Sequence, residues 1–233
     1  MGIVPVETAK ALLEAIDQFH GVLKEVWDKM EKFRHVLAEA YEALKVIGPL
    51  RRDIIELGDG YSFGPRGFYY MPGRGCYMHG ADQVITIMNF LEEHSKEELL
   101  QHVFKKKREL YGKLLDLIME LKKLPKVLTR HEVRGEKYFL RGLYYEPVRV
   151  TEITWSTDGK LALHLEDGTR VEITSLGWIT ERLLRCSNVL DELIEALREA
   201  GEKIDEMIRH NKEVVRKMKE LVAPQLVLEE LAG

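Results

Sequence analysis

The sequence predicts an α+β protein: a long antiparallel three-helix bundle with coiled-coil-like packing, and a small antiparallel β module inserted between helices two and three. Apolar residues recur every 3.5 positions near both ends of the chain, which is typical of long packed helices. Residues 126–175 contain short β-branched runs and Asp-Gly turns instead. The composition, 45% hydrophobic and 32% charged, is that of a folded chain.

The first helix is predicted over residues 1–50. Its apolar positions keep an unbroken 4-3-4-3 spacing through Leu12, Ile16, Phe19, Leu23, Val26, Met30, Phe33, Leu37, Ala40, Leu44 and Ile47. A second stripe lies one position further along, at Leu13, His20, Trp27 and Tyr41. The second stripe widens the apolar face of this helix. A wide apolar face favours three or more helices, packed up-down-up, over a two-stranded coil.

An insertion rich in glycine and aromatic residues follows at 51–81. Between residues 58 and 80 it contains seven glycines, six aromatic residues and two arginines. One interpretation is a surface that contacts a protein or stacks on nucleic-acid bases. The other is a β-hairpin that caps the bundle and buries its aromatic side chains. The candidate protein-contact residues are Tyr61, Phe63, Arg66, Phe68, Tyr69, Tyr70, Arg74 and Tyr77.

The second helix is predicted over 82–125, with a kink near residue 94. Ser95 and Glu98 have the spacing of a capping box, which marks a helix start after the kink. A weaker 3.5-residue repeat then continues to Pro125, where the helix should end.

The β module is predicted over 126–175. Asp158-Gly159 and Asp167-Gly168 are hairpin turns between short strands, which favours an SH3-like barrel or a curled sheet. Because such a small module is near the size limit for independent stability, it should pack on the bundle, and Trp178 is the candidate contact.

The third helix is predicted over 176–223, ending at Pro224 before a tail at 224–233. Asn211 is the single amide on its apolar stripe, and a buried Asn often fixes helix register or oligomeric state. The alternative is an exposed position near a frayed helix end. Gly201 follows Ala200 on the stripe, either admitting a bulky partner such as Trp27 or Phe33 or marking a hinge.

Catalytic and metal-binding motifs are weak or absent in the sequence. It has no nucleophile elbow, phosphate loop or H-E-x-x-H motif, so we expect no enzyme and no cofactor. Cys76 and His79 form one C-x-x-H pair without a second pair. His94, Glu98 and His102 have helical spacing, but such polar residues usually form a solvated face.

A basic stretch gives a nucleic-acid alternative. Its candidate residues are Lys105, Lys106, Lys107, Arg108, Arg130, Arg134, Lys137 and Arg141, with aromatic residues nearby. Lysine and arginine would neutralise phosphates while the aromatic rings stack on bases. The opposing interpretation is neutralisation by the acidic third helix. The formal net charge of −4 provides no general attraction to polyanions.

The function that we expect is therefore that of a non-enzymatic scaffold or adaptor acting through protein contacts or self-association, with nucleic-acid binding as the alternative. No secretion signal or spanning segment is evident, so a cytoplasmic location without membrane insertion is expected. Three Asn and four Gln among many charged residues are typical of proteins from hot environments.

Overall fold

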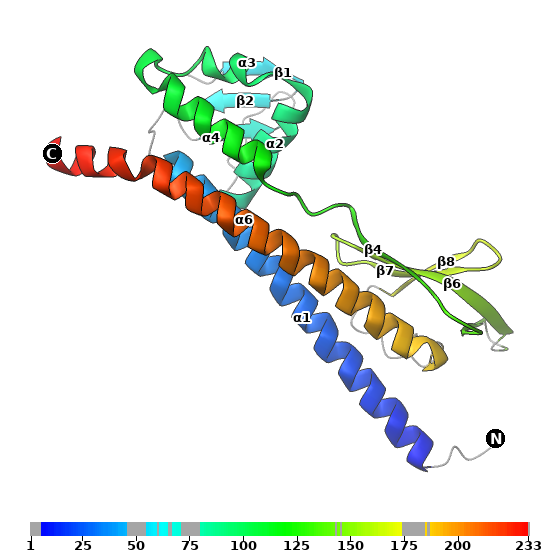
Figure 1. The fold of residues 1–233 in the computed structure, drawn as a ribbon. Helices are drawn as coiled ribbons and strands as arrows, with labels where there is room; N and C mark the ends of the chain where they lie inside the picture. Colours follow the sequence, from blue (N-terminus) through cyan, green and yellow to red (C-terminus); the bar gives the residue numbers. More distant parts are fainter. Residues whose placement is uncertain are drawn as a thin grey trace. The chain divides into compact units, whose positions relative to one another are not determined.

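The structure is a computed structural model that describes residues 6–45, 55–59, 61–64, 67–70, 80–142, 144, 146–173, 185 and 187–232. The chain divides into two units, and each is described by itself. The first unit contains residues 1–30 and 124–205, and the second contains 31–123 and 206–233. Two long helices, α1 (Val6–Lys45) and α6 (Leu190–Ala232), contribute to both units (Figure 1).

The first unit contains a five-stranded antiparallel sheet built around the long strand β6 (Glu146–Ser156). The path is β4-β6-β7-β8, and β5 pairs with β6 off this path. The other strands are β4 (Val127–Glu132), β5 (Tyr138–Arg141), β7 (Leu161–Leu165) and β8 (Arg170–Ile173). These strands form an open sheet rather than a closed barrel, so the barrel form of the prediction is wrong.

The predicted Asp-Gly turns connect the strands on either side of β7. Gly159 and Gly168 have φ angles of +80° and +82°, which glycine adopts without steric cost. A tryptophan pair packs α1 against the sheet: the rings of Trp27 and Trp155 meet edge to face, with centroids 5.8 Å apart. Trp178, the residue expected to make this contact, lies outside the described residues.

In the first unit, α1 and α6 run parallel and pack along the predicted 3.5-residue repeat. The order of contacts shows the direction, because Val26 lies beside Gly201, and Lys29, further along α1, pairs with Asp205, further along α6. An ion pair of 2.6 Å joins Lys29 to Asp205 at the same interface. The repeat is buried at Ile16, Phe19 and Val26 on α1 and at Leu190, Leu193, Leu197, Ala200 and Ile204 on α6.

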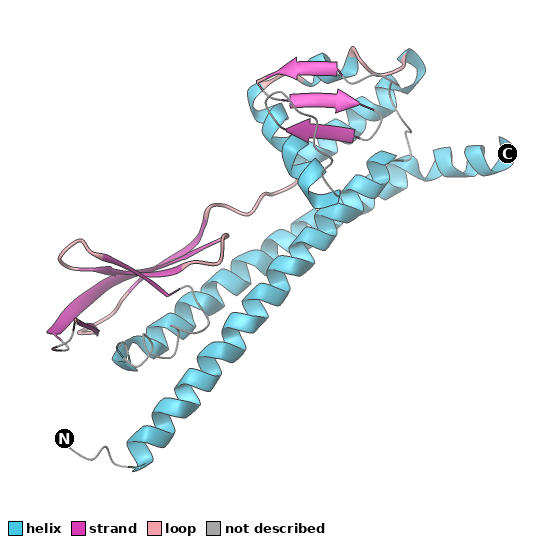
Figure 2. Cartoon of the chain, turned by 180° about the vertical axis from the view of Figure 1, so that it is seen from behind, coloured by secondary structure: helices cyan, strands magenta, loops and turns pink. Residues whose placement is uncertain are grey.

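The second unit places a three-stranded antiparallel sheet within the glycine- and aromatic-rich insertion. Its strands, in order, are β1 (Ile55–Gly58), β2 (Tyr61–Gly64) and β3 (Gly67–Tyr70). Figure 2 shows this sheet and the short helices of the second unit. These helices are α2 (Gly80–Glu93), α3 (Lys96–Leu100), the 3-10 turn η1 (Lys105–Lys107) and α4 (Arg108–Glu120).

The predicted long second helix is therefore replaced by several short ones. The kink near residue 94 is a complete break, because Ser95 has extended dihedral angles before α3. Glu98 accepts a 3.2 Å hydrogen bond from the Ser95 backbone N–H, which is one half of the predicted capping box. Phe104 breaks the helix again with ψ 133°. The mixed α+β class is confirmed, but a three-helix bundle is not.

The last helix continues past its predicted end at Pro224. A 3-10 turn, η2 (Ser187–Val189), leads into α6 at Leu190, and the predicted start at 176 lies outside the described residues. Pro224 lies inside α6, which continues to Ala232. Proline removes one backbone hydrogen bond and bends a helix, but it need not end it. The C-terminal stretch in Figure 1 turns away from the line of the preceding helix.

Candidate functional site: a buried His–Glu cluster and the predicted surfaces

The best-defined polar cluster in the first unit joins β4 to α6. Thr129 and His131 alternate along β4, so both side chains point to the same side of the sheet. Glu192 and Glu199 are seven residues apart on α6, which is about two helical turns and places both on one face. These four residues are called the His131 cluster below.

Both imidazole nitrogens of His131 face carboxylates. Nδ1 lies 2.9 Å from Oε1 of Glu199, and Nε2 lies 2.6 Å from Oε2 of Glu192. Thr129 donates its hydroxyl to the second oxygen of Glu199 at 3.1 Å. His131 is buried, whereas the Glu199 side chain is partly exposed.

This arrangement requires a protonated imidazole to satisfy both hydrogen bonds, because a neutral ring has only one N–H donor. Burial alone lowers the pKa of His131. The hydrogen bonds and negative charges of Glu192 and Glu199 outweigh burial and raise the pKa above the ordinary histidine value. His131 therefore carries its charge to higher pH than a free histidine does.

The cluster is better suited to holding β4 on α6 than to proton transfer with a substrate. Both ring nitrogens are occupied by carboxylates of the same chain, so neither is open to an incoming group. Lys203 adds a further link by donating to the Leu128 carbonyl at 3.2 Å. Within the described residues, no group of three or more His, Cys, Asp and Glu side chains is arranged to hold a metal ion.

Sequence reasoning did not select His131 as a site residue. The partners are 61 and 68 residues away, and no motif links them. Two signals were available in the sequence. Thr129 and His131 are polar residues two positions apart on a strand expected to be half-buried, and Glu192 and Glu199 are acids one heptad apart on the last helix. Either signal alone is common in solvated surfaces.

Asn211 is fully buried and hydrogen-bonds to the backbone that follows α4. Its Oδ1 accepts from the Lys122 N–H at 2.8 Å, and its Nδ2 donates to the Lys122 carbonyl at 3.0 Å. This burial excludes the exposed, frayed alternative. The bonds fix one extended segment against α6 within the second unit, and a role in oligomeric state stays a prediction.

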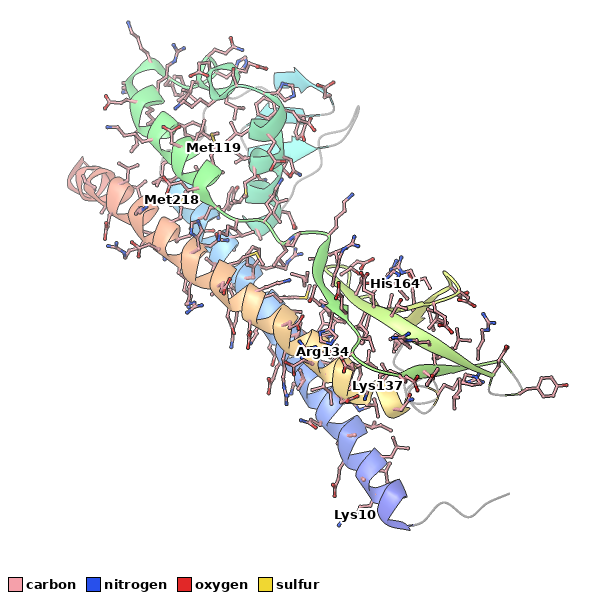
Figure 3. All side chains as sticks on the ribbon, turned by 45° about the vertical axis from the view of Figure 1, so that its right-hand side comes forward. Lys10, Met119, Arg134, Lys137, His164 and Met218 are labelled. Atoms are coloured by element: carbon pink, nitrogen blue, oxygen red, sulfur yellow. The ribbon has the colours of Figure 1, made fainter. Side chains whose placement is uncertain are left out.

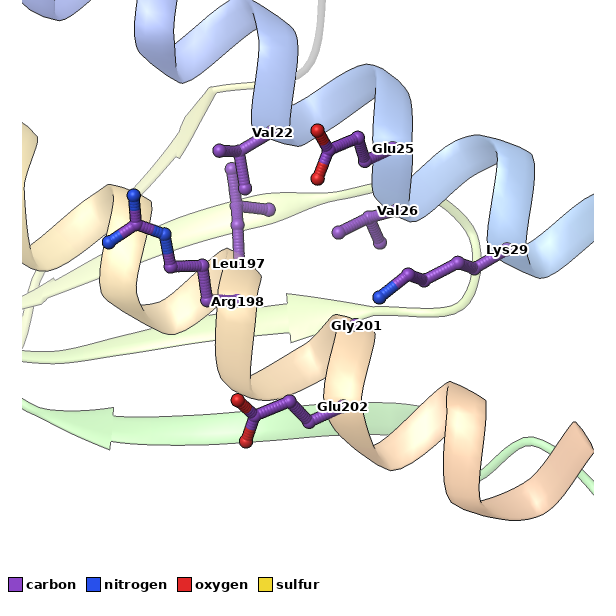
Figure 4. A pocket seen from close by; sticks show the side chains of 8 residues that line it. All are labelled: Val22, Glu25, Val26, Lys29, Leu197, Arg198, Gly201 and Glu202. Carbon is purple, nitrogen blue, oxygen red and sulfur yellow. The ribbon is translucent and has the colours of Figure 1, made fainter. Parts of the chain in front are cut away.

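Gly201 lies against Lys29 rather than against either aromatic residue that was expected. A Cβ atom at residue 201 would lie 3.1 Å from Nζ of Lys29 and 3.7 Å from Cγ2 of Val26. The interface here is hollowed into a pocket of about 140 Å³ (Figure 4). Its lining residues are Val22, Glu25, Val26, Lys29, Leu197, Arg198, Gly201 and Glu202.

The predicted protein-contact residues are only partly described. Tyr61 is buried, with its ring 5.4 Å from Phe90 of α2 and edge to face with it. Phe63, Phe68, Tyr69 and Tyr70 lie on β2 and β3, but their side chains are outside the described part of the structure. Arg66, Arg74 and Tyr77 lie outside the described residues, as do Cys76 and His79.

The candidate nucleic-acid residues of the first unit are largely paired with acids. Lys137 contacts Asp191 at 2.6 Å, Arg141 contacts Asp167 at 2.5 Å, and Arg130 lies 3.9 Å from Glu152. Figure 3 labels Lys137 and Arg134, which belong to the chain between β4 and β5. These pairs agree with the neutralisation alternative, although only Asp191 belongs to the acidic last helix.

The other candidate cations belong to the second unit, at η1 and the start of α4. Arg108 donates to the backbone carbonyls of Val103 and Gln101 at 2.9 and 3.1 Å, so it holds the turn in place. Lys105 and Lys106 are exposed, and the structure shows no ion pair between them and a described residue. Phe104 beside them is 54% exposed.

His94, Glu98 and His102 do not form the linear face that was considered. The break at Ser95 separates His94 at the end of α2 from Glu98 on α3. His94 stacks on Phe90, with centroids 4.3 Å apart, and its Nδ1 lies 3.3 Å from Oε2 of Glu98. His102 follows α3 and forms no metal-binding group with them.

No protein-family model, curated protein or solved structure matches the chain. None of the described helices is long and apolar enough to span a membrane.

Proposed function

We propose that the protein is a non-enzymatic adaptor or scaffold that works through protein–protein contacts, in an oligomer or a larger assembly. The chemistry-bearing groups that are described, such as His131 and Asn211, are used to hold segments of the chain together. Both long helices supply residues to two separate units, a design that gives one chain several surfaces to present to partners.

The observation that carries this proposal is an apolar stripe on α1 that changes from exposed to buried. Tyr41, on the second stripe of the helix, is buried in the second unit. In the first unit the same stripe is only partly covered: Leu13 is 63% exposed and His20 is exposed, whereas Trp27, at 44% exposed, also packs against Trp155 and Gly159. An apolar surface of this kind is typical of a protein interaction site.

The position of Leu13 strengthens this interpretation. Ile16, three residues on, belongs to the first stripe and is buried, so Leu13 borders the packed face of the helix. In both ribbon views the N-terminal end of α1 extends past the start of α6 (Figures 1 and 2). A partner helix placed against this end would continue the 3.5-residue packing that α6 provides further along.

Light scattering of the full chain over a range of concentrations tests self-association, and affinity capture from the native lysate tests other partners. The proposal predicts an oligomer or a stable captured partner, lost in Leu13→Gln and kept in the exposed control Lys24→Gln. A monomer that captures nothing, or capture that is equal in both variants, contradicts it.

A second candidate function, nucleic-acid binding, has one observation in its favour. The segment Phe104–Lys106 combines an exposed ring with two exposed lysines at a helix start, which suits stacking on a base and contact with phosphates. Fewer basic residues are available for nucleic-acid binding than the sequence indicated, because three of those in the first unit are paired with acids.

Binding of single-stranded DNA and RNA at several salt concentrations tests this candidate. It predicts that the double change Lys105→Gln/Lys106→Gln makes the log–log salt dependence shallower by about 1.4, since each phosphate contact contributes about 0.7. The matched control Lys24→Gln/Lys32→Gln removes two exposed lysines elsewhere and should leave the slope unchanged. No retention at low salt removes the candidate.

A further inference from the structure

We infer that the His131 cluster makes the docking of the first unit's sheet on α6 dependent on pH. The sheet stays docked while His131 is protonated and is released as the proton is lost. The inference is independent of which partner the protein binds. It concerns the contact between β4 and α6 within the first unit, and it rests on the geometry of four side chains.

Both hydrogen bonds of His131 have a fixed direction. Carboxylates accept hydrogen bonds and cannot donate them when ionised, so each of the two short contacts needs an N–H on the ring. Deprotonation leaves one ring nitrogen with a lone pair aimed at a carboxylate. One hydrogen bond of the buried ring is then lost and replaced by repulsion.

The acidic groups that contact His131 outnumber its single positive charge. From α6, the groups that face His131 are Glu192 and Glu199, with Lys203 bonded nearby to the Leu128 carbonyl. From β6, the cross-strand neighbour is the uncharged Ile153. When the proton leaves, no positive charge on the ring balances the two carboxylates. Their electrostatic repulsion then adds to the loss of the hydrogen bond.

The His131 cluster lies within the contact between β4 and α6. His131 pairs across the sheet with Ile153, and Thr129 pairs with Trp155, so the cluster lies beside the apolar residues on the same sheet face. Ile153 and Trp155 are both buried. Loosening β4 from α6 would therefore separate the edge of the apolar contact at Ile153 and Trp155. Apolar surface that is buried in the docked form would then be exposed.

A second histidine provides a matched comparison. His164 lies on β7, hydrogen-bonded to Thr154 at 3.0 Å and 3.8 Å from Glu152. Thr154 and Trp155 are adjacent on β6, so His164 occupies the opposite sheet face from the His131 cluster. Figure 3 shows His164 on the side of the sheet turned away from α6. Its protonation should leave the docking contact unchanged.

Hydrogen–deuterium exchange of the full chain between pH 6 and pH 8.5, corrected for intrinsic exchange rates, tests the inference. Protection of residues 127–133 should fall with pH, by about tenfold for each unit between the pKa of His131 in the docked and opened forms. The pH dependence should disappear in His131→Gln and persist in His164→Gln. It should shift to lower pH in Glu199→Gln, which keeps a side chain of the same shape.

An NMR titration of the His131 ring protons supplies a readout that does not depend on a variant folding. The inference predicts a midpoint above the ordinary histidine value and coincident with the loss of protection. A His131 midpoint below about 6.5, the value for free histidine, overturns it. Equal pH dependence of residues 127–133 in the wild type and in His131→Gln, if that variant folds, overturns it as well.

Discussion

Gly159 packs against the indole ring of Trp27 so closely that a Cβ atom at residue 159 would lie 2.2 Å from Cη2 of the ring. The hairpin turn between β6 and β7 thus contacts α1 directly, and glycine serves two purposes there. Its φ of +80° is unfavourable for other residues, and its missing side chain leaves room for the ring.

Replacement of Gly159 by alanine should therefore lower the free energy of unfolding by about 2–4 kcal/mol, from backbone strain plus displacement of Trp27. Gly168→Ala is the matched control, because Gly168 has a φ of +82° in a similar turn and no atom within 4 Å of its Cβ position. It should cost only the backbone strain of about 1–2 kcal/mol. Equal losses in urea denaturation would show that the Trp27 contact is unimportant.

Gly201→Ala should have the opposite sign. Alanine is favoured over glycine in a helix by about 1 kcal/mol, and the atom nearest to the new Cβ is Nζ of Lys29, the mobile end of a long side chain. We expect a gain of about 0.5 kcal/mol, below the gain of about 1 kcal/mol for Gly21→Ala, whose Cβ position is open. A loss of stability in Gly201→Ala alone would mean that Lys29 cannot move from its place beside Asp205.

Asn211→Ala should lower the free energy of unfolding by about 2–3 kcal/mol, because it leaves the N–H and carbonyl of Lys122 without their partner. Lys212→Ala, at the exposed neighbouring position, is the control and should change stability by less than about 0.5 kcal/mol. Chemical denaturation of both variants measures the difference, and light scattering checks whether oligomeric state changes as well. Similar stability of the two variants would exclude a structural role for the amide.

The stability of the protein should fall as pH rises through the pKa of His131. Because the folded-state pKa is raised above the unfolded value of about 6.5, the contribution of His131 to stability is complete below that value. It is lost progressively as pH rises through the folded-state pKa. Denaturation curves between pH 6 and pH 9 should show this fall in the wild type and not in His131→Gln; parallel curves would contradict it.

The extent to which the fold could be predicted depended on how local the signal was. The 3.5-residue repeat of Leu190, Leu193 and Leu197 lies in the sequence itself, and these residues are buried. The two Asp-Gly turns were found because glycine at positive φ has a two-residue signature. The long second helix was a wrong inference, since its repeat was weak around Lys107 and the extended conformation at Phe104 had no local marker.

The candidate site was harder to predict for a different reason. His131 meets Glu192 and Glu199 only because β4 docks on α6, and that contact depends on tertiary packing between distant segments. The bonds of Asn211 likewise reach a backbone segment 89 residues away, so the sequence indicated that its amide was unusual but not what it holds. Pro224 is the opposite case. It is a strong local signal for a helix end, but α6 continues past it.

The most direct test of a contact-based function compares the wild type, Leu13→Gln and Lys24→Gln in one experiment. Each full-length protein is checked for equal thermal stability and then measured by light scattering and by affinity capture from the native lysate. We predict that the wild type and Lys24→Gln form the same oligomer or retain the same partner, and that Leu13→Gln does neither. Monomeric behaviour without a partner in all three proteins, or identical assembly in all three, would contradict the proposal.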